Sequence, residues 1–109
     1  MTWERVCELD EIVPERGAAC LVDGEQVALF RLAGDEVAAV GNLDPFSHAN
    51  VISRGIVGTA KGRWFVASPM YKNRFDLLTG RCHEDDAVSL RVFSTRVQDG
   101  AVYVAVAKE

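Results

Sequence analysis

Turn-forming residue pairs recur along the chain at short intervals, and no other feature constrains its fold as strongly. Asp-Gly occurs at 23–24 and 99–100, Lys-Gly at 61–62 and Thr-Gly at 79–80, and AGDE at 33–36 is another turn-like segment. Asp-Gly between apolar runs predicts a β-hairpin, because a type I′ turn requires positive φ at both central residues. These intervals favour short antiparallel strands over βαβ units.

The segments between these turns have the composition and the alternation of strands. Val102, Val104 and Val106, for example, lie on one phase of an alternating run. A helix is expected only within 6–17, as one or two turns that Pro14 and Gly17 end. The pattern therefore predicts an all-β antiparallel sandwich or barrel. Its expected strands are AACLV, QVALFRL, EVAAV, GIVGTA, RWFVAS, RFDLLT, SLRVFSTRV and AVYVAV.

Length and composition indicate one ordinary globular domain covering residues 1–109. Hydrophobic residues make up 49% of the chain and charged residues 26%, and the net charge is −4. The negative charge argues against nucleic-acid binding, which needs a clustered basic face. No apolar run approaches the ~20 residues that cross a bilayer, and the N-terminus lacks a secretory signal, so a cytoplasmic protein without membrane contact is expected.

The three cysteines lie far apart in the chain and form neither a disulfide pattern nor a metal pattern. Cys7 and Cys20 lie among apolar residues and are expected to be small buried hydrophobic side chains. Cys82 precedes His83, but adjacent residues of an extended chain point to opposite faces. A metal shared by these two side chains is therefore not expected, and the acidic run at 84–86 indicates a solvated loop.

Two longer loops interrupt the series of hairpins. The first is the irregular link at 41–55, and the second is SPMYKN at 68–73. Long loops in a small domain usually carry function. In the segment after the second loop, Phe75 is expected in the core, and Asp76 and Thr79 are expected to shape a turn. The sequence has no nucleophile elbow, no phosphate-binding glycine loop and no metal-ligand spacing, so no catalytic residue is predicted.

The two loops resemble the cluster-binding loops of the Rieske iron–sulfur fold, which carry a C-x-H motif and a C-x-x-H motif. Asp44 and Phe46 stand at the Cys and His positions of the first motif. Ser68 and Tyr71 stand at those of the second. The resemblance implies a Rieske-like fold with two long loops at one end, but with all four cluster ligands replaced. The matching framework residues are Pro45, Pro69, Arg74, Phe75, Asp76, Thr79 and Gly80.

The full sequences of the two loops, NLDPFSHANVISRGIVG and SPMYKNRFDLLTG, are similar to those of one Rieske-like family in particular. This family is the small subunit of the assimilatory NAD(P)H-dependent nitrite reductase. The resemblance implies an accessory subunit that has no cofactor of its own. It also implies a large catalytic subunit as partner, which in that family carries FAD, an iron–sulfur cluster and sirohaem, and reduces nitrite to ammonium.

Without a cluster, the side chains in the loops need other roles. Asp44 and Ser68 each precede a proline, and their oxygens are expected to accept backbone N–H bonds within turns. Phe46, Met70 and Tyr71 are bulky enough to fill the space of a cluster with apolar surface. These positions are therefore predicted to be structural replacements for the cluster.

The loop tips also have the residue types of a protein-binding surface, because aromatic, Met and Arg side chains are enriched in interface cores. The candidate partner-binding residues are Phe46, His48, Met70, Tyr71, Lys72 and Arg74. Two other functions stay open. One is a Rieske-type ferredoxin that carries electrons, and the other is a stand-alone binding or regulatory module on a degenerate Rieske scaffold.

Overall fold

The computed structural model describes residues 2–106 of the chain. Within this range the chain forms β-strands and two short 3-10 helices, η1 (Leu9–Glu11) and η2 (Ile52–Arg54). The strands are β1 (Thr2–Glu8), β2 (Gly17–Val22), β3 (Glu25–Arg31), β4 (Val37–Gly41), β5 (Ile56–Ala60), β6 (Arg63–Ala67), β7 (Arg74–Asp76), β8 (Val92–Phe93), β9 (Thr95–Gln98) and β10 (Ala101–Val106).

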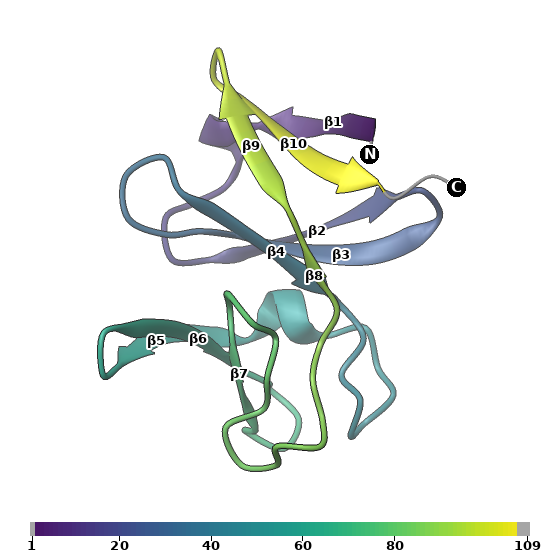
Figure 1. Cartoon of the computed structure of the whole chain (residues 1–109), viewed down its shortest axis with the longest axis vertical. Helices are drawn as coiled ribbons and strands as arrows, with labels where there is room; N and C mark the ends of the chain where they lie inside the picture. The colour runs from purple at the N-terminus through teal and green to yellow at the C-terminus, as the bar shows by residue number, and fades with distance from the viewer. Residues whose placement is uncertain (1, 107–109) are drawn as a thin grey trace.

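The strands form three antiparallel sheets that follow one another along the long axis of the molecule (Figure 1). The first has the order β1-β10-β9, the second β2-β3-β4-β8 and the third β5-β6-β7. This arrangement confirms the all-β class and the antiparallel pairing that the turn pattern predicts. No helix within residues 2–106 is long and apolar enough to cross a membrane.

The hairpin turns have the geometry that their residues indicate. Asp23 and Gly24 have φ of 50° and 79°, and Val22 pairs with Glu25 across them. The Asp-Gly pair at 99–100 and the Lys-Gly pair at 61–62 also have two positive φ values each. All three are two-residue connections of the primed type, whose twist matches that of the strands.

The central sheet is buried on both faces and supplies both hydrophobic clusters of the molecule. Val27 and Leu29 of β3 contact the cluster below the first sheet. Ala28 and Phe30 of the same strand belong to the cluster that also contains Phe75 of the third sheet. Because successive side chains on a strand point to opposite faces, one strand can support both neighbours. Ile52 belongs to this second cluster and Phe46 packs against it, which fixes the position of the first long loop.

The N-terminal segment differs from the helix expected at 6–17. Residues up to Glu8 belong to β1, which pairs with β10, and only Leu9–Glu11 is helical. The expected helix is thus present as a single 3-10 turn. It is shorter than 6–17 because residues up to Glu8 pair with a strand about a hundred residues away in sequence. The expected apolar phase of β10 is confirmed, since Val102, Val104 and Val106 are buried.

Burial of the cysteines also differs in part from expectation. Cys7 and Cys20 are half-buried, and both line the edge of the first cluster rather than its interior. Cys82 is the fully buried one. Strand β7 is shorter than expected and ends at Asp76, because the side chain of Asp76 turns the backbone at 77–79.

Candidate functional site

The first loop closes around Asp44. The N–H of Asp44 donates to the carbonyl of Ala49 at 2.8 Å, and the N–H of His48 donates to the carbonyl of Asp44 at 2.8 Å. The carboxylate Oδ1 of Asp44 accepts the N–H of Phe46 at 2.8 Å and that of Ser47 at 3.4 Å. This is the turn-forming role predicted for Asp44, and the residue is fully buried.

The second loop repeats this backbone frame around Ser68. The N–H of Ser68 donates to the carbonyl of Asn73 at 2.9 Å, and the N–H of Lys72 donates to the carbonyl of Ser68 at 3.0 Å. The hydroxyl of Ser68 accepts the N–H of Met70 at 3.2 Å, as predicted. Lys72 and its counterpart His48 both have left-handed φ, at 64° and 60°. The two loops are therefore related copies of one turn.

A direct hydrogen bond joins the two loops where their buried polar side chains meet. The hydroxyl of Ser68 donates to Oδ2 of Asp44 at 2.5 Å, and neither residue is exposed. Burial raises the pKa of Asp44, but the hydrogen bonds from Ser68, Phe46 and Ser47 outweigh it and hold the pKa below its ordinary value. Asp44 is therefore a carboxylate at neutral pH. Both loops lie at the lower end of the molecule in Figure 1.

The bulky loop side chains divide between the interior and the surface. Phe46 packs against the second hydrophobic cluster, with its ring centroid 6.3 Å from that of Phe75. Met70 is 50% exposed and Tyr71 is 62% exposed. The expectation that these side chains are buried to fill the space of a cluster is wrong for Met70 and Tyr71, because the second loop turns its tip outward. For Phe46 the space-filling role stays a prediction.

The remaining candidate residues at the loop tips lie on the surface. His48 and Lys72 are exposed at the corresponding left-handed positions of their loops. Arg74 follows the second loop, and its Nε donates to Glu84 at 2.8 Å. Sequence reasoning did not detect the contact of Arg74 with Glu84, because it joins the start of β7 to a loop residue ten positions later, and the path of that loop is not visible in the sequence.

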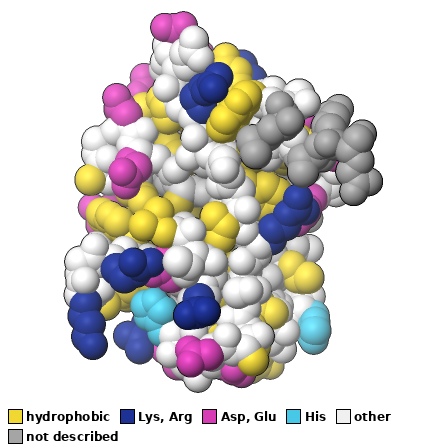
Figure 2. Space-filling model, in the orientation of Figure 1, with side chains coloured by type: hydrophobic (Ala, Val, Ile, Leu, Met, Phe, Trp, Pro, Cys, Tyr) yellow, Lys and Arg dark blue, Asp and Glu magenta, His cyan; other side chains and the backbone are white. Residues whose placement is uncertain are grey.

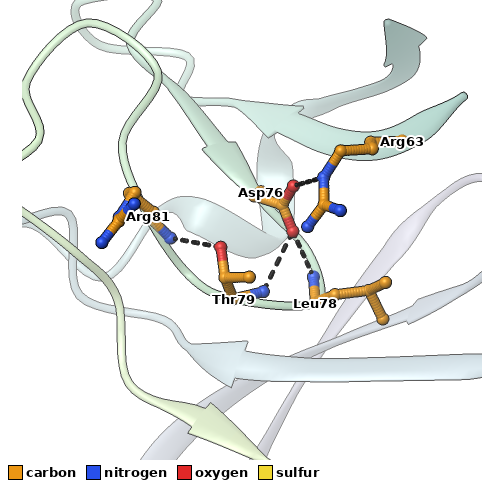
Figure 3. A network of polar contacts seen from close by, with 5 residues as sticks. All are labelled: Arg63, Asp76, Leu78, Thr79 and Arg81. Atoms are coloured by element: carbon orange, nitrogen blue, oxygen red, sulfur yellow. Dashed lines mark hydrogen bonds and ion pairs between the residues drawn. The ribbon is translucent and has the colours of Figure 1, made fainter. Parts of the chain in front are cut away.

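The turn after β7 is built around Asp76 (Figure 3). Its Oδ1 accepts the N–H groups of Leu78 and Thr79 at 2.8 and 2.9 Å. Its Oδ2 accepts Nε of Arg63 at 2.5 Å. Burial raises the pKa of Asp76, but the hydrogen bonds from Arg63, Thr79 and Leu78 outweigh it and lower the pKa to about 2. The turn-shaping role of Asp76 is confirmed, whereas Arg63 was not predicted.

Possible metal donors do not gather in the loops. Within residues 2–106 no group of three His, Cys, Asp or Glu side chains is placed to hold a metal ion. Cys82 lies outside both loops and pairs with Phe75 of β7 through an isolated bridge, and its Sγ is within 3.7 Å of a carboxylate oxygen of Glu84. Burial raises the pKa of the Cys82 thiol, so the thiol stays protonated at neutral pH.

Comparison with known proteins places this geometry in a family. The model of the Rieske-like [2Fe-2S] domain family matches residues 2–105. A nitrite reductase (NADH) small subunit of Salmonella typhimurium is 45% identical over 92% of this chain and 94% of its own. A crystal structure of a candidate NADH-dependent nitrite reductase small subunit from Mycobacterium tuberculosis is 47% identical over 99% of this chain and 97% of that one, with a TM-score of 0.94.

A third similar protein has a different architecture. A nitrite reductase [NAD(P)H] large subunit of Klebsiella oxytoca is 41% identical over 94% of this chain, which corresponds to 11% of that protein. A segment of the same kind is thus built into a much longer chain there. The family model matches nearly the whole length of the chain, and the small subunit of Salmonella typhimurium is 45% identical to it. Both findings agree with the two Rieske-like loops. This chain belongs to the Rieske-like [2Fe-2S] domain family and, within it, to the nitrite reductase (NADH) small subunits.

Proposed function

We propose that this chain is a cytoplasmic, non-catalytic accessory subunit of an NAD(P)H-dependent nitrite reductase, which reduces nitrite to ammonium. The hydrogen bond between Ser68 and Asp44 is the observation that carries the proposal. It joins the two positions where the Rieske motifs have cysteines. A bond between two side chains takes the place of ligands to iron, and no electron-transfer step is assigned to this chain.

The chemistry of the loop side chains supports this proposal. A Rieske [2Fe–2S] centre is held by two thiolates and two imidazoles. Asp44 and Ser68 are hard oxygen groups that are already engaged with each other and with backbone N–H groups. Phe46 has no donor atom and lies against the core. The residues present therefore do not fit the cluster that gives the family its name.

The partner that we propose is the large catalytic subunit. The small-subunit relatives and the Klebsiella oxytoca large subunit support this, because a homologous segment inside a large subunit indicates that the two parts work together. In the family that the loops resemble, the large subunit carries FAD, an iron–sulfur cluster and sirohaem. The cofactors of the reaction would then all lie in the partner.

The surface that we propose for binding the large subunit is the loop-tip surface. Its core is formed by Met70 and Tyr71, whose exposure leaves them free to be buried against a partner. Arg74, held by Glu84, lies beside them in sequence and supplies a positioned cation. His48 and Lys72 are exposed at the rim of this surface, and Phe46, the remaining candidate, is half-buried against the second hydrophobic cluster.

Iron content tests the loss of the cluster. The purified chain is expected to contain no stoichiometric iron or acid-labile sulfide and to show no visible absorption. As a matched control, the fourfold variant Asp44→Cys, Phe46→His, Ser68→Cys, Tyr71→His restores the ligand pattern, and it is expected to take up iron on reconstitution. Stoichiometric iron and sulfide in the unmodified chain would overturn the proposal and favour a ferredoxin-type electron carrier.

Co-expression with the large subunit tests the accessory role. The two chains are expected to co-purify, and nitrite reduction with NADH or NADPH is expected to depend on the large subunit alone for its cofactors. The isolated small chain is expected to show no turnover. Failure of the chains to associate at any ratio would count against the accessory role and favour a stand-alone binding module.

A further inference from the structure

A positively charged pocket lies away from the Asp44–Ser68 contact, between the β5–β6 turn and the segment after β7. It has a volume of about 500 Å³, and we call it the cationic pocket. Four of its lining side chains are basic: Lys61, Arg63, Arg74 and Arg81. Figure 2 shows Lys and Arg side chains gathered around a His at the lower left, where Figure 1 places the β5–β6 hairpin.

Arg63 is held in a way that leaves its terminal nitrogens available. Its Nε donates to Oδ2 of Asp76, a carboxylate that is itself buried and fixed by two backbone N–H groups. Within residues 2–106 the two terminal nitrogens of Arg63 make no hydrogen bond. Its guanidinium is therefore anchored at one edge and presents its terminal pair of donors (Figure 3).

Arg74 repeats this arrangement on a neighbouring strand. Its Nε donates to Oε2 of Glu84 at 2.8 Å, and its backbone N–H donates to Oε1 of the same carboxylate at 2.8 Å. The guanidinium carbon lies 5.8 Å from the ring centroid of Phe65, and the ring of His83 packs edge-on against that ring at 5.8 Å. Arg74 is thus also positioned, with terminal donors that no described residue engages.

The charge within the pocket is unbalanced in favour of cations. Asp76 of the lining is paired with Arg63, and Arg74 is paired with Glu84, which does not line the pocket. Asp86 is then the acidic lining residue that faces the other two cations. Among residues 2–106, Lys61 and Arg81 have no ion-pair partner. The net charge of the whole chain is −4, so the positive charge of this pocket is a local feature. It attracts anions although the chain as a whole is negative.

We propose that the cationic pocket binds a small multivalent oxyanion, carried by a phosphate or carboxylate compound. Guanidinium groups recognise both chemistries through paired N–H···O bonds, and the two positioned arginines present such pairs. Lys61 and Arg81 add charge at the mouth of the pocket without being tied to a carboxylate. Arg74 also belongs to the loop-tip surface proposed for the large subunit, so the two sites share this residue. Titration of the isolated chain tests anion binding separately from the accessory role.

The test is an NMR titration of the full ¹⁵N-labelled chain with pyrophosphate and, separately, with citrate. Sodium chloride at matched ionic strength is the control for screening. Saturable shifts are expected at the amides of 61–63, 74 and 79–83. Binding of pyrophosphate alone identifies a phosphate ligand, and binding of citrate alone identifies a polycarboxylate. Shifts that sodium chloride reproduces, or the absence of saturable shifts, would overturn the proposal.

Two matched variants locate the site. Arg81→Gln removes a cation whose side chain makes no described hydrogen bond, so the fold is retained, and it is expected to weaken binding about tenfold. Arg54→Gln removes an exposed arginine outside this pocket and is expected to leave the dissociation constant unchanged. Equal weakening by both variants would show that the anion responds to net charge, and the proposal would then be wrong.

Discussion

The two long loops share one backbone and differ in what their side chains do. In each loop a buried polar residue, Asp44 or Ser68, precedes a proline. Its backbone N–H donates to the carbonyl five residues later, and its own carbonyl accepts the N–H four residues later. The first loop then packs Phe46 against the core, whereas the second exposes Met70 and Tyr71. A common frame therefore supports a structural loop and an accessible loop.

The backbone frame and the tips of the two loops are stabilised by different means. The frame depends on buried hydrogen bonds, which cost most when one partner is removed and the other stays buried. The tip of the second loop contributes little buried surface, so its residues are free to serve recognition. Substitutions in equivalent positions of the two loops should consequently have unequal effects.

The largest effect is expected for Asp44→Ala. The change leaves the hydroxyl of Ser68 and the N–H groups of Phe46 and Ser47 without their buried acceptor. A loss of about 3–4 kcal/mol in the free energy of unfolding is expected from these unsatisfied groups. Urea denaturation provides the measurement. The matched change Ser68→Ala should cost about half as much, and equal losses would contradict the central place given to Asp44.

Phe46→Ala is expected to cost about 2 kcal/mol, because a half-buried ring that packs on Phe75 is removed from the core. Tyr71→Ala, at the tip of the other loop, is expected to change stability by less than about 0.5 kcal/mol. Thermal and urea unfolding of both variants measure the contrast. Similar losses in the two loops would refute the division into a structural and an accessible loop.

The first loop should supply part of the acid sensitivity, alongside Asp76, whose pKa is lowered to about 2. The folded pKa of Asp44 is lowered, so its contribution to stability is present above its unfolded pKa of about 4 and is lost as the pH falls. Asp44→Asn should weaken the dependence of the unfolding free energy on pH below about pH 4, and the contribution of Asp76 should remain. Ser68→Ala, which removes one hydrogen bond to the carboxylate, should weaken this dependence without abolishing it. If the pH dependence of the unfolding free energy is unchanged in Asp44→Asn, that dependence comes from other carboxylates.

The smallest effect on stability, combined with a clear effect on binding, is expected for the double variant Met70→Ala, Tyr71→Ala. Both side chains are exposed, so the free energy of unfolding should change by less than about 0.5 kcal/mol. Association with the large subunit should weaken about tenfold or more. Isothermal titration with the large subunit measures this, and an unchanged affinity in a folded variant would remove the loop tip from the interface.

Local features of the fold were predictable from the sequence, and the reason is their short range. The Asp-Gly turns require positive φ at two adjacent residues, and the phase of Val102 to Val106 is visible within one strand. The turn roles of Asp44, Ser68 and Asp76 were equally predictable, because each side chain bonds an N–H only two residues later. The resemblance of the two loop sequences to the Rieske-like pattern predicted the family.

Burial of the loop tips was not predictable in the same way. Phe46 and Tyr71 are both bulky aromatic residues two or three positions after a buried polar residue, yet Phe46 is half-buried against the core and Tyr71 is exposed. The direction of each tip depends on whether a face of the second hydrophobic cluster lies beneath it. No residue within the loop itself encodes that position.

By itself, the sequence determined the strands, the hairpin turns, the two loops and the residues that cap them, because these depend on groups a few residues apart. Only the tertiary structure decided that Ser68 bonds Asp44, that Arg63 is anchored by Asp76 and that basic side chains from separate segments share one pocket. Those contacts join residues from different strands and loops. They form only when the register of the sheets and the packing of both cores bring the segments together.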